Sequence, residues 1–194
     1  MALLLSVLEQ GMIYGILALG VYITYKILDF PDLTVDGSFP FGAAITVRLI
    51  NGFGVPAILT LPIAFLGGAL VGICTGLIHV KLKVRDLLSG IIMMTGLYTI
   101  NLWVAGSGYV AIFDKDNIFN NSFVNSITPG FLVNFKNVII IFLITMVAKY
   151  LLDWYMSTKS GFLLRAVGDN DTIVTSLGVD KGLVKIVGLS IANG

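Results

Sequence analysis

The sequence predicts an all-α integral membrane protein built as a multi-span helical bundle. Three observations indicate this class: 57% of the 194 residues are hydrophobic, 12% are charged, and the mean hydropathy is +0.96. Soluble domains carry about 25% charged residues, so this chain cannot cover a globule with water-compatible side chains. The bilayer is therefore the natural solvent for most of it.

The composition also limits the chemistry available to the chain. Its net charge of +1 gives no reason to expect a nucleic-acid partner. Cys74 and His79 are single residues of their type, which excludes an internal disulfide and a Cys/His zinc cluster. The nucleotide-binding pattern G-x-x-x-x-G-K-[ST] is absent, as are H-E-x-x-H and G-x-S-x-G. We expect no catalytic residue, metal or cofactor here, so any ATP-driven work must use ATP and Mg held by another chain.

Four hydrophobic runs are long enough to cross a bilayer. They cover residues 5–28, 55–80, 87–105 and 135–156. The first lacks a basic leading region and contains Glu9, so we expect a retained helix and not a cleaved signal. A fifth run begins near residue 183 and stops at the last residue, about two-thirds of the way across. Because a helix that ends in hydrocarbon leaves carbonyls unpaired, we expect five or six segments of a longer protein, the last one truncated.

Residues 33–50 form an ambiguous segment. The run is apolar from Phe39, but Asp36 comes before it and Pro40 falls in its first turn, where a helix tolerates proline. Ser38 can cap this helix. We expect a short or broken membrane helix entered from a polar turn, and the sequence leaves open whether it crosses or re-enters.

Lysine and arginine side chains set the predicted orientation. They gather in residues 81–86 and 157–182, whereas residues 106–134 carry a single lysine and many Asn, Ser and Gly. We expect the two basic segments to face the cytoplasm and 106–134 to face outward. If 33–50 crosses, alternation places the turn at 29–36 inside and the N-terminus outside.

Glycines at four-residue spacing predict close helix contacts. Gly68, Gly72 and Gly76 share a face of one hydrophobic run, and Gly11 and Gly15 share a face of another. Small residues at this spacing let helix backbones approach closely in lipid. We expect both sets to serve packing within the chain, with contact between two copies as the alternative.

The stretch TKSGFLLRAVGDNDTIVTSLG, residues 158–178, is a polar interruption between two hydrophobic runs. Gly168 and Gly178 suit the left-handed ends of two short helices, which would join at Gly168. Helices this short are marginal in water and need a surface to pack against. That surface is either the membrane and the protein's own loops, or a groove in another subunit. Three residues can cap the second helix: Asp169, Asn170 or Asp171.

The same stretch resembles the T-x-x-G-x-x-x-R-A-x-G-x-N…x-L-G-I/V-[ND] loop of ABC importer permeases of the branched-chain amino acid and ribose type. The start, LEQGMIYGILALGVYITYKILDF, is similar to that family's first span. PDLTVDGSFPFGAAI looks most like the sub-branch paired with lipoprotein binding proteins for aromatic amino acids. Phe162 departs from the pattern, because many relatives carry arginine there. The matching loop positions are Thr158, Gly161, Arg165, Ala166, Gly168, Asn170, Leu177, Gly178 and Val179.

The resemblance implies a single transmembrane permease domain over residues 1–194, with about eight or more spans of roughly 20 residues each in the whole protein. It implies the permease subunit of an ATP-driven importer that takes a small solute, an aromatic or branched-chain amino acid, from an extracytoplasmic solute-binding lipoprotein. The other implied partners are an ABC ATPase subunit and a second permease subunit forming a homodimer, in the bacterial inner membrane. Residues 157–182 would be the loop that couples the ATPase to the membrane helices.

Within that loop, we expect Arg165 to anchor the coupling element to the ATPase or to a nearby carboxylate. The alternative is an arginine that reaches to the membrane interface. The other residues that the resemblance assigns to coupling are Thr158, Gly161, Ala166, Gly168, Asn170, Leu177 and Gly178.

Polar groups at membrane depth are the candidates for the solute pathway or its gate. Asp36 is the first choice, flanked by Thr34 and Ser38, because broken helices line binding sites in many transporters. The predicted topology also allows Asp36 to lie in a solvated turn near the cytoplasmic edge, as gate or scaffold. Asn101 is a further candidate, with a helix–helix hydrogen bond as the alternative.

A different class of function remains as the alternative: a secondary transporter or channel that acts without an ATPase. It predicts uptake in the absence of nucleotide. The polar stretch at 158–178 argues against it, because a carrier that works alone has no need of a docking element.

Overall fold

The computed structural model describes residues 2–108, 110, 118–119, 135–176 and 178–194. All regular structure in these ranges is helical, which confirms the predicted fold class. The helices are α1 (Ala2–Val21), the π-helix η1 (Tyr22–Ile27), α2 (Val35–Phe53), α3 (Ala57–Leu82), α4 (Asp86–Ala105), α6 (Lys136–Met156), α7 (Lys159–Asp169), α8 (Asp171–Ser176) and α9 (Lys181–Asn193).

Four helices in the described part are long and apolar enough to cross a membrane. They are Leu3–Ile27, Ala57–Leu82, Asp86–Ala105 and Lys136–Met156, and the four predicted runs match them to within two residues at each end. Continuous hydrophobicity over the bilayer thickness is a strong signal, because a span needs roughly 20 apolar residues.

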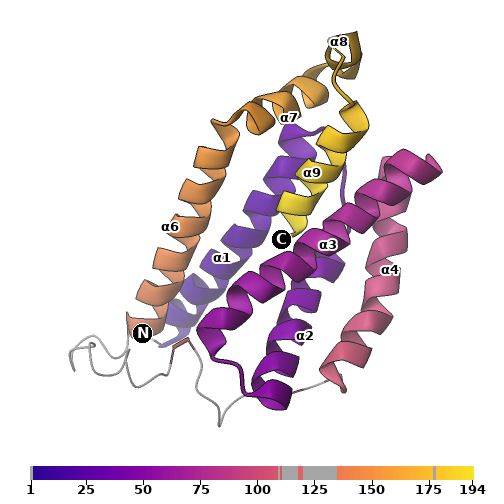
Figure 1. The fold of residues 1–194 in the computed structure, drawn as a ribbon. Helices are drawn as coiled ribbons and strands as arrows, with labels where there is room; N and C mark the ends of the chain where they lie inside the picture. The colour runs from indigo at the N-terminus through magenta and orange to yellow at the C-terminus, as the bar shows by residue number, and fades with distance from the viewer. Residues whose placement is uncertain (1, 109, 111–117, 120–134, 177) are drawn as a thin grey trace.

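The helices form one bundle, and the short helices α7 and α8 lie at one of its ends (Figure 1). Helix α6 lies beside α1, where Thr145 Oγ1 donates to the Met12 carbonyl oxygen at 3.4 Å. Helices α7 and α8 lie at the same end as the α3–α4 connection (Figure 1). We call this the α7 end. The basic segments 81–86 and 157–182 therefore share one end, as alternation predicts.

After η1 the chain returns through the bundle, first as an extended segment and then as a helix. We call this part of the chain the second crossing. After η1, residues 29–33 have no regular structure, and α2 begins at Val35. The Leu33 backbone packs on Gly90 near the start of α4, whereas Gly37 packs on Leu97 in the middle of α4. Helix α2 thus begins inside the bundle and runs to the end opposite α7 (Figure 1). The segment 33–50 therefore runs through the bundle toward its far end, although α2 is not among the four helices long and apolar enough to cross a membrane.

Two expectations about the start of α2 are wrong. The helix is continuous from Val35 to Phe53, with Pro40 in its second turn, where proline has no N–H to donate to the Asp36 carbonyl oxygen. Ser38 is not the cap, because Thr34 holds that position and Ser38 lies inside the helix. The Thr34 N–H is satisfied instead by Asp32 Oδ1, at 2.8 Å. The entry is therefore a buried polar segment and not a solvated turn.

The glycine face of α3 packs against α9. A Cβ at Gly68 would collide with the Asn193 carbonyl oxygen, and one at Gly72 with that of Leu189. This confirms packing within the chain for that face. The prediction is wrong for Gly11 and Gly15, because a Cβ at either would meet nothing within 4 Å among the described residues.

The main apolar core lies at the α7 end. It joins η1 and the following segment to α7, α8 and α9, so the short helices rest on buried hydrophobic contacts and not on their own propensity. Its largest fully buried members are Ile23, Leu28, Phe30, Leu164, Val174 and Leu189.

Candidate functional site

The turn from α6 into α7 is built by two residues of the predicted coupling motif. Thr158 is the N-cap of α7, and its Oγ1 accepts a hydrogen bond from Gly161 N–H at 3.4 Å. Thr158 Oγ1 also donates to the Tyr155 carbonyl oxygen at 2.6 Å. A Cβ at Gly161 would lie 2.6 Å from Met156 Cα, so only glycine fits this corner. Both residues fix the angle between the two helices.

Gly168 holds α7 against the first span. It lies inside α7, which ends at Asp169, so the expectation that Gly168 ends this helix in a left-handed conformation is wrong. A Cβ here would collide with the Ile27 carbonyl oxygen at the end of η1. The glycine is needed because two backbones touch, and π-helical segments such as η1 are frequent at functional positions.

The joint between α7 and α8 is at Asn170. Its Oδ1 accepts a hydrogen bond from Thr172 N–H at 3.1 Å, which confirms Asn170 among the predicted caps. Gly178 has a φ of 79°, and its N–H donates to the Thr175 carbonyl oxygen at 3.0 Å. The left-handed end predicted at Gly178 is confirmed. Leu177, also assigned to coupling, lies outside the described residues.

Helix α7 has one buried and one exposed face. Leu164 and Val167 are buried in the core. The exposed face, which we call the α7 outer face, is formed by Phe162, Arg165, Ala166 and Asp169. Phe162 is 60% exposed, and Arg165 makes no ion pair with any described residue. Exposed aromatic rings and guanidinium groups are enriched in protein-binding surfaces and also occur at the membrane interface.

A buried polar cluster lies deeper in the bundle. Asp32 Oδ2 accepts a hydrogen bond from Asn193 Nδ2 at 2.7 Å, and Ser38 Oγ donates to Asn193 Oδ1 at 2.9 Å. Thr34 and Thr75 share a hydrogen bond of 3.0 Å between their hydroxyl oxygens. All five side chains are buried, and together they join the extended segment to α2, α3 and α9.

The sequence prediction recovers part of this cluster. Thr34 and Ser38 belong to it, whereas Asp36 points away and is exposed. Asn101 lies nearby: its Nδ2 donates to the Gly37 carbonyl oxygen at 3.1 Å, and its buried Oδ1 has no partner among the described residues. The residues that the prediction missed are Asp32, Thr75 and Asn193. For Asn193, the sequence offered one signal: a single amide in a mostly apolar run. For Asp32, the signal was its place in the PDLTVDGS stretch that also contains Thr34 and Ser38.

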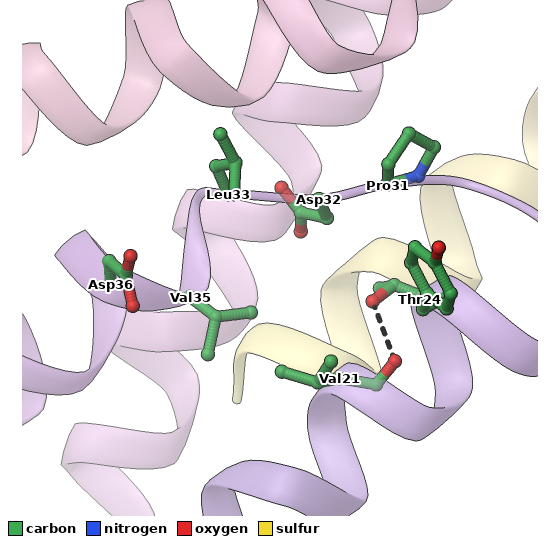
Figure 2. A pocket seen from close by; sticks show the side chains of 8 residues that line it. Val21, Thr24, Pro31, Asp32, Leu33, Val35 and Asp36 are labelled. Carbon is green, nitrogen blue, oxygen red and sulfur yellow. Dashed lines mark hydrogen bonds between the residues drawn. The ribbon is translucent and has the colours of Figure 1, made fainter.

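A cavity of about 190 Å³ lies between η1 and the start of α2. Figure 2 shows its walls, with Asp32 on the extended segment and Asp36 on the first turn of α2. On the η1 side the polar side chains are Thr24, whose Oγ1 donates to the Val21 carbonyl oxygen at 3.1 Å, and Tyr25. The full lining is Val21, Thr24, Tyr25, Pro31, Asp32, Leu33, Val35 and Asp36.

Asp36 precedes a residue that packs well inside the bundle. The next residue, Gly37, packs on Met94 and Leu97 of α4. From Asp86, the start of α4, to Leu97 a helix rises by about 16 Å, so this contact is far from the α3–α4 connection. A carboxyl group on the wall of a mostly apolar cavity is a candidate for contact with a small solute.

Four spans, a jointed element at one end and polar groups buried at membrane depth define a multi-pass membrane permease. The chain belongs to the family described as branched-chain amino acid transport system, permease component, whose profile matches residues 3–192. Members of this family are the transmembrane subunits of ABC transporters, which confirms the resemblance drawn from the loop at 158–178.

The relatives carry several substrate names. A tyrosine transport system permease protein of Clostridioides difficile is 42% identical over 98% of this chain and 60% of its own length. A probable branched-chain amino acid transport permease protein of Methanocaldococcus jannaschii is 28% identical over 90% of the chain and 58% of its own length. A ribose import permease protein of Haemophilus influenzae is 25% identical over 94% of the chain and 54% of its own length.

The chain thus spans about 60% of the length of the tyrosine permease that it resembles. No solved structure is significantly similar to it.

Proposed function

We propose that this chain belongs to the permease subunit of an ATP-driven importer for a small solute, an aromatic or branched-chain amino acid. The observation that carries the proposal is the construction of α7 and α8. Helix α7 is fixed to the first span at Gly168, and the described residues leave the α7 outer face uncovered. A surface of this kind suits a partner that performs mechanical work on the bundle. The tyrosine permease among the relatives supports an aromatic substrate.

The coupling residues divide into two groups by what they touch. Thr158, Gly161 and Gly168 face the protein and set the position of α7. Arg165 and Ala166 face outward, and we assign contact with the ATPase to them. The ATP and Mg would be held by that ATPase subunit, and this chain would need no cofactor of its own.

The remaining partners follow from the same proposal. A second copy of the permease would complete the pathway, and an extracytoplasmic solute-binding lipoprotein would deliver the solute at the end opposite α7. That end would face outward and the α7 end the cytoplasm of a bacterium, as the basic residues indicate. The solute would pass the cavity beside Asp36.

The test uses the full-length permease with its ATPase and binding protein in proteoliposomes, and radiolabelled tyrosine as the probe. We expect uptake only when ATP is present. Tyrosine uptake at the same rate without nucleotide would favour the secondary transporter or channel instead.

One substitution tests the assignment of ATPase contact to the α7 outer face. Arg165→Ala removes a guanidinium that forms no ion pair with any described residue. It should lower uptake per ATP hydrolysed by about tenfold, the value of one charge-assisted contact. Lys81→Ala is the matched control, because it removes one exposed positive charge at the same end outside α7. Equal uptake in wild type and Arg165→Ala would contradict the assignment.

A further inference from the structure

Asn193 is the one side chain among the described residues that joins α9 to both parts of the second crossing. Its Nδ2 donates to Asp32 Oδ2 at 2.7 Å, in the extended segment. Its Oδ1 accepts from Ser38 Oγ at 2.9 Å, in α2. Asp36 lies between these two attachment points. We call the three side chains Asp32, Ser38 and Asn193 the clasp.

The clasp is placed to hold firmly. Both of its hydrogen bonds are buried, and each joins two side chains that are themselves buried. A broken bond would therefore leave a buried polar group without a partner, which is costly. Asp32 is fully used, because its other oxygen accepts from Thr34 N–H at 2.8 Å.

Helix α9 is tied directly to the coupling loop. It begins at Lys181, and its cap Asp180 accepts from Gly182 N–H at 2.8 Å. Midway along α9, Gly188 packs against Leu164 of α7, where a Cβ would lie 2.6 Å from a Leu164 methyl carbon. A displacement of α7 therefore acts on α9 through the chain and through this contact.

The contact between α9 and α3 is close packing. The α9 backbone meets Gly68 and Gly72, and the Ile186 side chain lies against Gly76. Small residues permit this close approach in lipid. The clasp supplies the hydrogen bonds that attach α9 to the segment that bears Asp36.

We propose that Asn193 is a positioning residue through which movement of the coupling loop is transmitted to Asp36 and its cavity. This proposal rests on the proposed function and adds a route for the movement. A displacement of α7 would move α9, and α9 would move Asp32 and Ser38 through the clasp. These two residues would then shift the first turn of α2. Asn193 itself does not contact the solute.

The donor and acceptor pattern makes a sharp mutational test possible. Asn193→Asp removes the amide that donates to Asp32 and, at 3.1 Å, to the Leu189 carbonyl oxygen, so the clasp should open. Adding Asp32→Asn restores the bond between residues 32 and 193 with the roles exchanged: the new amide at 32 donates to the carboxyl group at 193, whose other oxygen accepts from Ser38. Asp32→Asn alone should have a milder effect, because the amide oxygen at 32 can still accept from Asn193 Nδ2.

The experiment compares these variants in the full-length permease, assembled with its ATPase and binding protein in proteoliposomes. ATP hydrolysis and uptake of radiolabelled tyrosine are measured together. A third readout is the rate at which a thiol reagent labels Leu33→Cys, in a Cys74→Ser background, with and without ATP and vanadate. Leu33 lines the cavity and is 39% exposed, so it reports the position of the segment without being part of the clasp.

We expect Asn193→Asp to keep ATP hydrolysis within about twofold of wild type and to lose about tenfold in uptake per ATP, as for one buried hydrogen bond. Its labelling rate should no longer respond to vanadate. The double variant should recover both. If Asn193→Asp does not assemble, Ser38→Ala replaces it, since it removes one attachment and should lower uptake per ATP in part.

Wild-type coupling in Asn193→Asp or in Ser38→Ala would overturn the proposal, and so would a double variant that assembles but stays uncoupled. These outcomes differ from a failure of the proposed function. In that case the wild-type protein itself would show tyrosine uptake without ATP, or no response of the labelling rate to vanadate.

Discussion

At the scale of single residues, the glycines of this chain have different roles that their spacing does not reveal. Gly168 and Gly72 each touch a carbonyl oxygen of another helix, whereas Gly11 faces open space. The absence of a Cβ is required at the first two positions and dispensable at the third. Substitution by alanine separates these roles.

We expect Gly168→Ala to destabilise the protein, because the new Cβ collides with the Ile27 carbonyl oxygen. Overpacking of this kind costs about 1–3 kcal/mol. Thermal unfolding of the purified protein in detergent measures the effect. Gly11→Ala is the control and should match or slightly exceed wild-type stability, since alanine favours a helix. Equal melting temperatures for Gly168→Ala and Gly11→Ala would show that α7 is not held at this point.

Asp36 is the residue whose change should affect solute binding. Removing its charge with Asp36→Asn should raise the KM for tyrosine uptake by about tenfold, as expected for a lost charge-assisted contact. The control is Asp29→Asn, an exposed carboxylate outside the cavity lining, at a left-handed position that asparagine tolerates. An unchanged KM for Asp36→Asn would remove Asp36 from the pathway.

At the scale of helices, much of the architecture could be predicted from the sequence. Long apolar runs fixed the boundaries of four spans, because the bilayer demands both length and hydrophobicity. The second crossing was harder, since polar residues at 32–38 are typical of a turn on the surface as well as of a buried extended segment. Nothing local distinguishes the two, and contacts with α4 decide it.

Helix α9 gives a prediction at the same scale. Its close contact with α3 requires glycine at Gly72, where a Cβ would collide with the Leu189 carbonyl oxygen. Gly72→Ala should therefore lower the melting temperature, with a cost again of about 1–3 kcal/mol. Gly96→Ala, in α4, meets nothing within 4 Å and serves as the control. A larger loss for Gly96→Ala than for Gly72→Ala would contradict the packing of α9 on α3.

At the scale of the whole molecule, two sites lie at different depths. The α7 outer face is at one end, and the cavity beside Asp36 lies inside the bundle. The sequence predicts the first surface from one contiguous motif. It named two of the five residues of the polar cluster, because Asp32, Thr75 and Asn193 come from three distant segments and meet only in the fold.

The central claim is that an ATPase docks on the α7 outer face. The most direct measurement replaces Phe162 by a photoreactive benzophenone amino acid in the full-length permease and irradiates the assembled membrane complex. We predict a covalent product with the ATPase subunit from position 162, and none from Phe142, which is 47% exposed on α6 within a span. Lipid adducts alone from both positions would contradict the account.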